Sequence, residues 1–187
     1  ENLLLGGHRI TNTTDLSGLK TIKRLALTDN NLSEIQGLAE LIGLEYLYLT
    51  ENRLSDLRPL RKLISLRELH LQHNHLADMS PIANLSELRV LGLSGNFLKD
   101  LGPVEGMQNL RRIVLSDNSF SLNDSNTERI IEELRTSGAR VIQGKQTEVS
   151  KEMSRLLFIL MRDKKSNRIL GDYLKANRYE RLFDYVR

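Results

Sequence analysis

The stretch LALTDNNLSEIQGLAELIGLEY, residues 25–46, is followed without a gap by three further stretches of the same length and pattern. The period is 22 residues; a further copy begins at Ile113 and a degenerate earlier one at Leu3. One unit of this size cannot bury its leucines alone, so we expect consecutive units to stack and to share one long core. The first core residues of the six units are Leu3, Leu25, Leu47, Leu69, Leu91 and Ile113.

Each unit begins with a short alternating segment whose first and third residues are apolar, which is typical of a strand with one buried face. Stacking would set these strands side by side, about 4.8 Å apart, in a parallel sheet. The leucines would point into the core, and the residues between them would face outward on what we call the concave face. Asparagines recur at the following bend, where their amides should satisfy backbone groups of adjoining turns. They are Asn30, Asn52, Asn74, Asn96 and Asn118, with His8 in the equivalent place of the first unit.

The return segment of each unit is too short for a long helix. Pro59, Pro81 and Pro103 stand in phase at its start, where a fixed φ suits the first turn of a helical piece. We therefore expect 3-10 turns or single helical turns on this convex side.

Residues 124–142 leave the spacing and predict a closing helix and strand. Asp124, Ser125 or Asn126 can cap the helix, and Gly138 is a stop signal. Its apolar stripe would be Ile130, Ile131 and Leu134. A final helix that covers the open end of the core is what a terminal repeat needs.

The recurring pattern L-x-x-L-x-L-x-x-N-x-L, for which Ile22, Leu25, Leu27, Asn30 and Leu32 form one copy, resembles the signature of leucine-rich repeat proteins. It is similar to the 22-residue class found in phosphatase regulatory subunits, an axonemal dynein light chain and bacterial internalins. The resemblance implies an α/β solenoid: a right-handed superhelix with a parallel concave sheet, 3-10 or short helical turns on the convex side and a C-terminal helical appendage. It also implies a protein-binding role without naming the partner.

Charge divides the chain into two expected parts, a repeat domain at 1–143 and a basic helical segment at 144–187. Residues 140–187 hold 12 Lys and Arg against 6 Asp and Glu, whereas residues 1–139 hold 15 against 18. Apolar residues in the C-terminal segment return with helical spacing, and it holds five of the nine aromatic residues. The first of its apolar stripes comprises Met153, Leu156, Leu157, Leu160 and Met161.

About forty residues cannot form a stable core alone, so this segment must rest on something. Docking onto the last repeat, pairing with a second copy and capture of a partner remain open. Its basic residues interleaved with aromatics also permit the alternative of nucleic-acid or anionic-membrane binding.

The histidines of LHLQHNHLADM, residues 69–79, raise the question of a metal site. On the repeat, His70 faces the concave surface, His73 lies at its rim and His75 points elsewhere. A catalytic zinc usually takes three protein ligands, and the only further acid nearby is Glu51. We therefore interpret the histidines as surface residues and keep a metal-dependent enzyme at His70 and His73 as the alternative.

Lateral neighbours on the strands point to a partner-binding surface instead. Tyr46 and Tyr48 both face outward, and tyrosine is frequent at interface hot spots. Gly92 and Gly95 lie beside His70 and His73, so we expect a notch there that accepts a protruding side chain. A histidine pair would also make binding sensitive to mild acid. The predicted site has Tyr46, Tyr48, His70 and His73 at its centre, with Arg24, Glu68, Val90 and Arg112 around them.

Other features favour a non-enzymatic interaction module without a cofactor. The chain has no cysteine, which excludes disulfides and thiolate chemistry. It has no phosphate loop, no nucleophile elbow, no apolar run of transmembrane length and no visible signal peptide, so its location stays open, with the cytoplasm as working hypothesis. The first unit lacks the leucine expected three residues before Leu3, which predicts that a cap or further repeats precede it.

Overall fold

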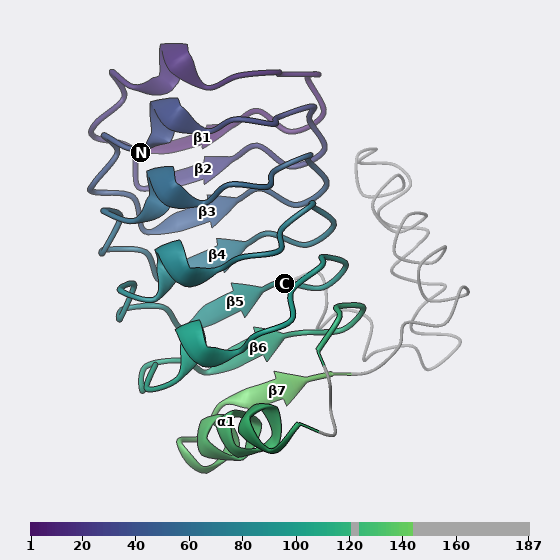
Figure 1. The fold of residues 1–187 in the computed structure, drawn as a ribbon. Helices are drawn as coiled ribbons and strands as arrows, with labels where there is room; N and C mark the ends of the chain where they lie inside the picture. Colours follow the sequence, from purple (N-terminus) through teal and green to yellow (C-terminus); the bar gives the residue numbers. More distant parts are fainter. Residues whose placement is uncertain (121–123, 144–187) are drawn as a thin grey trace, which may run out of the picture. The chain divides into compact units, whose positions relative to one another are not determined.

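The computed structural model describes residues 1–120 and 124–143, and the predicted solenoid is confirmed. Figure 1 shows short parallel strands stacked in chain order, each with its return segment on the same side. The seven strands form one sheet in the order β1 to β7. Their bounds are β1 (Asn2–Leu4), β2 (Arg24–Ala26), β3 (Tyr46–Tyr48), β4 (Glu68–His70), β5 (Val90–Gly92), β6 (Arg112–Val114) and β7 (Arg140–Ile142).

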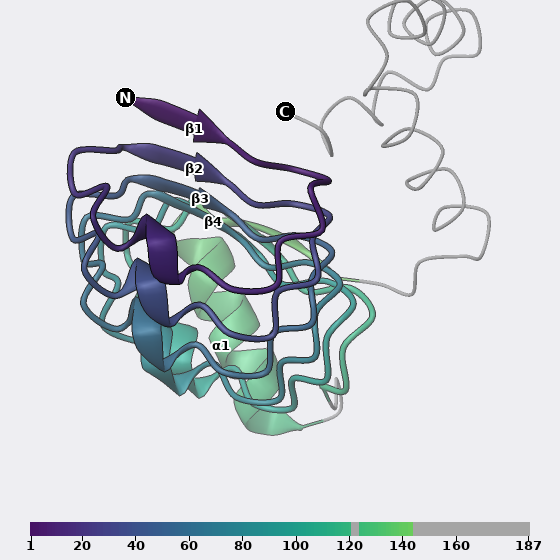
Figure 2. The same ribbon diagram turned by 90° about the horizontal axis from the view of Figure 1, so that it is seen from above.

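The convex side consists of 3-10 turns, as predicted. Seen along the stack in Figure 2, they lie across the core from the strands. The three prolines are the second residues of η3, η4 and η5. The turns are η1 (Thr14–Leu16), η2 (Gln36–Leu38), η3 (Arg58–Leu60), η4 (Ser80–Ile82) and η5 (Gly102–Val104).

The register places residues 22 apart directly beside one another. Tyr48 pairs with His70, and His70 pairs with Gly92, so the predicted lateral file exists. The leucines of the strands point the other way, and Leu25, Leu47, Leu69 and Leu91 are fully buried. Apolar burial of this kind is the main favourable term in folding.

The bend asparagines join each repeat to the one before it. Asn74 accepts a hydrogen bond from the Leu54 backbone N–H at 2.9 Å and donates to the carbonyls of Leu49 and Leu71, both at 3.0 Å. The first unit has His8 instead of an asparagine at its bend, and there Asn30 of the second unit accepts from the backbone N–H groups of both His8 and Ile10. Backbone groups that neither strand nor helix serves are thereby satisfied. The pattern seen at Asn74 repeats at Asn52, Asn96 and Asn118.

The predicted closing elements are confirmed. Helix α1 (Ser125–Thr136) is capped by Asp124, whose carboxylate accepts the Thr127 N–H at 2.9 Å. Gly138 has a φ of +93°, in the left-handed region that favours glycine after a helix. The stripe of Ile130, Ile131 and Leu134 is buried and closes the core beside β7. Among the residues described, no helix is long and apolar enough to cross a membrane.

The C-terminal segment at 144–187, with its expected helices, lies outside the described residues. Its roles as cap, dimerisation element or second contact therefore stay predictions.

Replacing Asn74 with alanine tests the asparagine ladder. The change leaves the buried Leu54 N–H without its acceptor and removes one bond from each of two carbonyls. We expect the free energy of unfolding to fall by about 3 kcal/mol, measured by urea denaturation. Asn109→Ala is the matched control, because its one hydrogen bond to Ser86 is exposed, and should cost about 0.5 kcal/mol or less. Equal effects of the two variants would contradict a structural role for the ladder.

Candidate binding surface on the concave face

A stacked pair of rings forms the centre of the concave face. The rings of Tyr48 and His70 lie 4.9 Å apart between centroids with an interplanar angle of 17°. Adjacent strands place them there, since β3 and β4 hold the two residues in direct register. Glu68 contacts both: the Tyr48 hydroxyl donates to its carboxylate at 3.2 Å, and His70 Nε2 lies 3.7 Å from it. The Glu68 carboxylate, on the same strand as His70, therefore contacts both rings.

The second tyrosine is held from the preceding repeat. The guanidinium carbon of Arg24 lies 4.4 Å from the centroid of the Tyr46 ring, a cation–π contact. Arg24 and Tyr46 are register partners on β2 and β3. The structure thus gathers five of the eight predicted site residues into one ring cluster: Arg24, Tyr46, Tyr48, Glu68 and His70.

A polar relay continues the ring cluster toward the rim. The Thr50 hydroxyl donates to the Gln72 side-chain oxygen at 3.0 Å, and the Gln72 amide nitrogen lies 3.4 Å from His70 Nδ1. The His70 ring thus lies between the Gln72 amide, which faces Nδ1, and the Glu68 carboxylate, which faces Nε2. Thr50 and Gln72 are not among the site residues predicted from the sequence. Their place two residues beyond Tyr48 and His70 on the outward face was the signal that could have found them.

The predicted notch beside the histidines is wrong, because long side chains fill it. A Cβ atom built on Gly92 would meet the Gln72 amide, and one built on Gly95 would meet the His73 ring. Glycine at both places leaves room for these side chains to lie across the next strand. The side chains of Gln72 and His73 thus cover the surface above Gly92 and Gly95, where the notch was expected.

His73 occupies a special backbone position at the rim. It has a φ of +54°, and its counterparts Asp29, Glu51, Gly95 and Asp117 are also left-handed. This region costs an ordinary L-residue about 1 kcal/mol or more. The His73 ring lies against Gly95 of the next repeat.

The remaining predicted residues extend the same file. Val90 on β5 pairs in register with Glu68, and Arg112 on β6 pairs with Val90; both are partly exposed. They flank the ring cluster on the side of the later repeats.

The third histidine lies apart, as predicted. His75 stacks on Phe97 at 6.2 Å, and this pair belongs to the segment after the bend. Across residues 1–120 and 124–143, no three histidine, aspartate or glutamate side chains come together in a way that could hold a metal ion. The geometry of the His70, His73 and Glu51 alternative is therefore not met.

Electrostatics tie Glu68 and Tyr48 together. The contact with His70 lowers the pKa of the Glu68 carboxyl below its ordinary value against the opposing effect of burial, and the Tyr48 hydroxyl and the Arg24 charge lower it further. Burial raises the pKa of the Tyr48 phenol, and the Glu68 charge raises it further. Both shifts favour an ionised carboxylate bonded to a neutral phenol at neutral pH.

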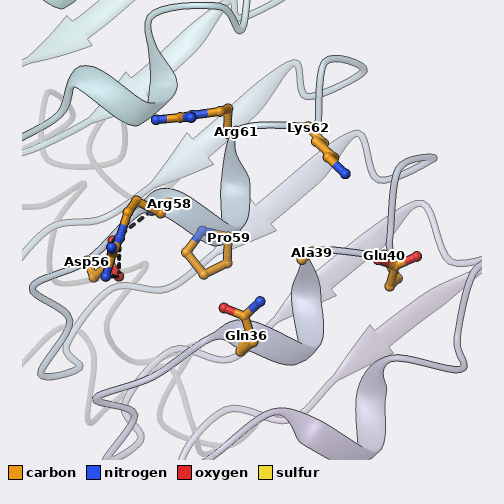
Figure 3. A pocket seen from close by; sticks show the side chains of 8 residues that line it. All are labelled: Gln36, Ala39, Glu40, Asp56, Arg58, Pro59, Arg61 and Lys62. Atoms are coloured by element: carbon orange, nitrogen blue, oxygen red, sulfur yellow. Dashed lines mark hydrogen bonds and ion pairs between the residues drawn. The ribbon is translucent and has the colours of Figure 1, made fainter.

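A hollow on the convex side is the competing site. It has a volume of about 560 Å³ and lies between η2 and η3 (Figure 3). Its most conspicuous contact is internal, since Arg58 pairs with Asp56 at 2.8 Å. Ligand pockets are predominantly apolar and aromatic, whereas this hollow is not, so the concave face is the better candidate. The lining residues are Gln36, Ala39, Glu40, Asp56, Arg58, Pro59, Arg61 and Lys62.

Comparisons with known proteins agree with this geometry. A family model described as leucine-rich repeats in two copies matches residues 42–84. No curated protein sequence gives a significant match. Among solved structures, internalin F of Listeria monocytogenes is 20% identical with a TM-score of 0.58, over 78% of this chain and 49% of its own. Internalin C2 of the same organism is 27% identical with a TM-score of 0.57, over 73% of this chain and 67% of its own.

A plant protein has the same fold. The ectodomain of the membrane receptor kinase GASSHO1/SCHENGEN3 from Arabidopsis thaliana, in complex with CASPARIAN STRIP INTEGRITY FACTOR 2, is 23% identical with a TM-score of 0.64. The match covers 78% of this chain but 18% of the receptor chain. The chain thus spans about half the length of internalin F and a smaller part of the receptor.

Glu68→Gln tests the carboxylate at the centre. A carboxyl whose pKa is lowered by folding stabilises the fold above its unfolded pKa of about 4.3, and this contribution is lost as pH falls through the folded value. We expect Glu68→Gln to reduce stability at pH 7 and to flatten the decline of the urea midpoint below about pH 4.3. Glu87→Gln, at an exposed position, is the control and should keep the parent's slope.

His73→Gly tests the strain at the rim. Glycine has no penalty at a φ of +54°, so the free energy of unfolding should rise by roughly 1 kcal/mol. His75→Gly, two residues along and outside the left-handed region, should instead lower it by roughly the same amount. A loss of stability in both variants would show that the His73 ring contributes more by covering Gly95 than it costs in strain.

Proposed function

We propose that this chain, a leucine-rich repeat solenoid, is a non-enzymatic interaction module that binds a protein partner through its concave face. The observation that carries the proposal is the ring cluster, in which two tyrosines are held by contacts from neighbouring strands. Leucine-rich repeat proteins with this fold typically mediate protein–protein interaction and are generally not enzymes.

Pre-organised aromatic side chains suit a binding role. Binding costs free energy for every flexible side chain that becomes fixed. Tyr46 under Arg24 and Tyr48 against His70 are already fixed in the free protein, and tyrosine supplies a large contact area with a polar tip. When a partner covers these tyrosines, little conformational entropy is lost in fixing them, so most of the free energy from burying apolar surface contributes to binding.

The similar structures support the same class of function. The receptor ectodomain was solved in complex with CASPARIAN STRIP INTEGRITY FACTOR 2, which shows a leucine-rich repeat fold engaged with a partner. We extend the general role to this chain and leave the partner's identity open. The segment 144–187 is proposed to act as cap, dimerisation element or second contact.

Tyr46→Ala/Tyr48→Ala is the direct test. Immobilised full-length chain is used to capture proteins from a lysate, and the captured proteins are identified by mass spectrometry. We expect the double variant to lose the proteins that the parent retains, while stability falls by no more than about 2 kcal/mol.

Ile42→Ala/Ile64→Ala is the matched control. These residues are 61% and 59% exposed in the turns before β3 and β4, and their truncation removes apolar surface without touching the ring cluster. Capture should be retained by this variant. If the tyrosine variant also retains the parent's proteins, the concave face is not the binding surface.

A further inference from the structure

The hollow on the convex side is lined by a basic turn that the other 3-10 turns lack. Residues 58–62, on η3 and just after it, read Arg-Pro-Leu-Arg-Lys and place three cations within five positions. The apolar third residue is what the core needs, and it is buried in η2 to η5. The cations are therefore not required by the fold. The equivalent stretches read Thr-Asp-Leu-Ser-Gly at 14–18, Gln-Gly-Leu-Ala-Glu at 36–40, Ser-Pro-Ile-Ala-Asn at 80–84 and Gly-Pro-Val-Glu-Gly at 102–106.

The two arginines of this turn stand on one side of the hollow. Arg58 is the first residue of η3, and Arg61 is its C-terminal cap. Side chains three residues apart are eclipsed in a 3-10 turn, so the two guanidinium groups leave the backbone in a similar direction. Figure 3 shows both of them on the side of Asp56. Lys62 and Glu40 line the opposite side in the same view.

The Asp56 carboxylate holds Arg58 in place. Arg58 Nε donates to its two oxygens at 3.0 and 2.9 Å, and Nη2 lies 2.8 Å from Oδ2. The same carboxylate also accepts the Arg58 backbone N–H at 2.8 Å. These contacts occupy one edge of the planar guanidinium group and leave Nη1 for a further acceptor. A ligand that binds Arg58 would therefore lose little free energy in ordering it.

Arg61 is the cation of the hollow that no nearby carboxylate engages. The hollow is lined by three cations and two carboxylates, of which Asp56 is bound to Arg58 and Glu40 lies on the side of Lys62. Within residues 1–120 and 124–143, the exposed Arg61 side chain makes no hydrogen bond or ion pair. The positions one repeat before and after it hold Ala39 and an alanine at 83, so small side chains leave space around its guanidinium group.

We propose that this hollow binds a phosphoryl group between the guanidinium groups of Arg58 and Arg61. Guanidinium groups bind phosphate oxygens with paired, charge-assisted hydrogen bonds. The volume of about 560 Å³ lies within the range of ligand pockets, about 300–1,000 Å³. The polar lining suits a small anion better than an apolar ligand, and a phosphate of charge near −2 gains more from it than a single carboxylate.

The inference goes beyond the proposed function, because the hollow lies across the core from the concave face (Figure 2). A phosphoryl group is offered both by a free phosphate anion and by a phosphoserine in a protein segment. The chemistry at the two guanidinium groups is the same for both, and the test separates them.

The test uses the full chain and a fluorescein-labelled glycine-rich peptide with one phosphoserine, followed by fluorescence anisotropy. Peptides with serine or glutamate in that place should bind at least about tenfold more weakly than the phosphopeptide. Arg61→Gln should weaken binding of the phosphopeptide at least about tenfold, because it removes one guanidinium group. Arg61→Lys keeps the charge but loses the planar fork, so it should still weaken binding by about threefold or more.

Arg53→Gln is the matched control. Arg53 is exposed on the segment after the bend, and within the described part of the chain its side chain makes no hydrogen bond or ion pair. The substitution makes the same change in net charge as Arg61→Gln and should change the affinity by about twofold or less. Urea denaturation of both variants checks that the fold is kept; should Arg61→Gln unfold, Arg61→Lys carries the test.

Inorganic phosphate, added as a competitor, distinguishes the two sources. Displacement near the concentration at which the peptide binds would assign the site to a free phosphate anion. Displacement only at concentrations more than about tenfold higher would assign it to a phosphorylated segment, and both results support a phosphoryl site.

Three results would overturn the proposal. The first is that the parent chain binds neither the phosphopeptide nor inorganic phosphate. The second is an equal loss of affinity in Arg61→Gln and Arg53→Gln, which would mean that net charge alone attracts the peptide. The third is a glutamate peptide that binds as tightly as the phosphopeptide, which would make the hollow a site for carboxylates.

Discussion

The side-chain amide of one asparagine per repeat is the contact on which the rest of this structure depends. A chain that turns sharply after a three-residue strand leaves backbone donors and acceptors that no regular element can satisfy, and such groups are costly when buried. Asn52, Asn74 and Asn96 satisfy these groups in the same way. Each side-chain amide forms hydrogen bonds with the backbone of its own strand, of the preceding bend and of the preceding strand. The bend can therefore form only when the neighbouring repeat is in register. As a result, each period of 22 residues in the sequence corresponds to one fixed step along the stack of strands.

The same fixed step determines how the exposed surface is built. Because the repeats are related by a near-constant step, a surface is made of files in which each residue touches the one 22 positions away. The Tyr48–His70 stack and the Arg24–Tyr46 contact are both of this kind. So is the space above Gly92, which is open in one repeat and filled from the one before it by Gln72. Side chains of one repeat thus contact the next repeat, and the exposed surface of each repeat is formed together with its neighbours.

Much of this could be predicted from the sequence, for a physical reason. A strict period with strand alternation fixes both which residues are lateral neighbours and which face they occupy, so the positions of Tyr48, His70 and Gly92 followed directly. Periodicity says nothing about the direction of a long side chain, which is why the expected notch turned out to be covered by Gln72 and His73.

The alternation rule also ends where the strand ends. The backbone at His73 is left-handed, a feature that the pattern of apolar residues does not contain. What distinguishes one repeat from the next is then the informative part of the sequence. The core leucines and bend asparagines recur in every repeat, whereas tyrosine on β3 and histidine on β4 occur where the solenoid itself has no need of them. Residues that the fold does not require, gathered on one face as Tyr46, Tyr48 and His70 are, are what we expect of a surface selected for binding.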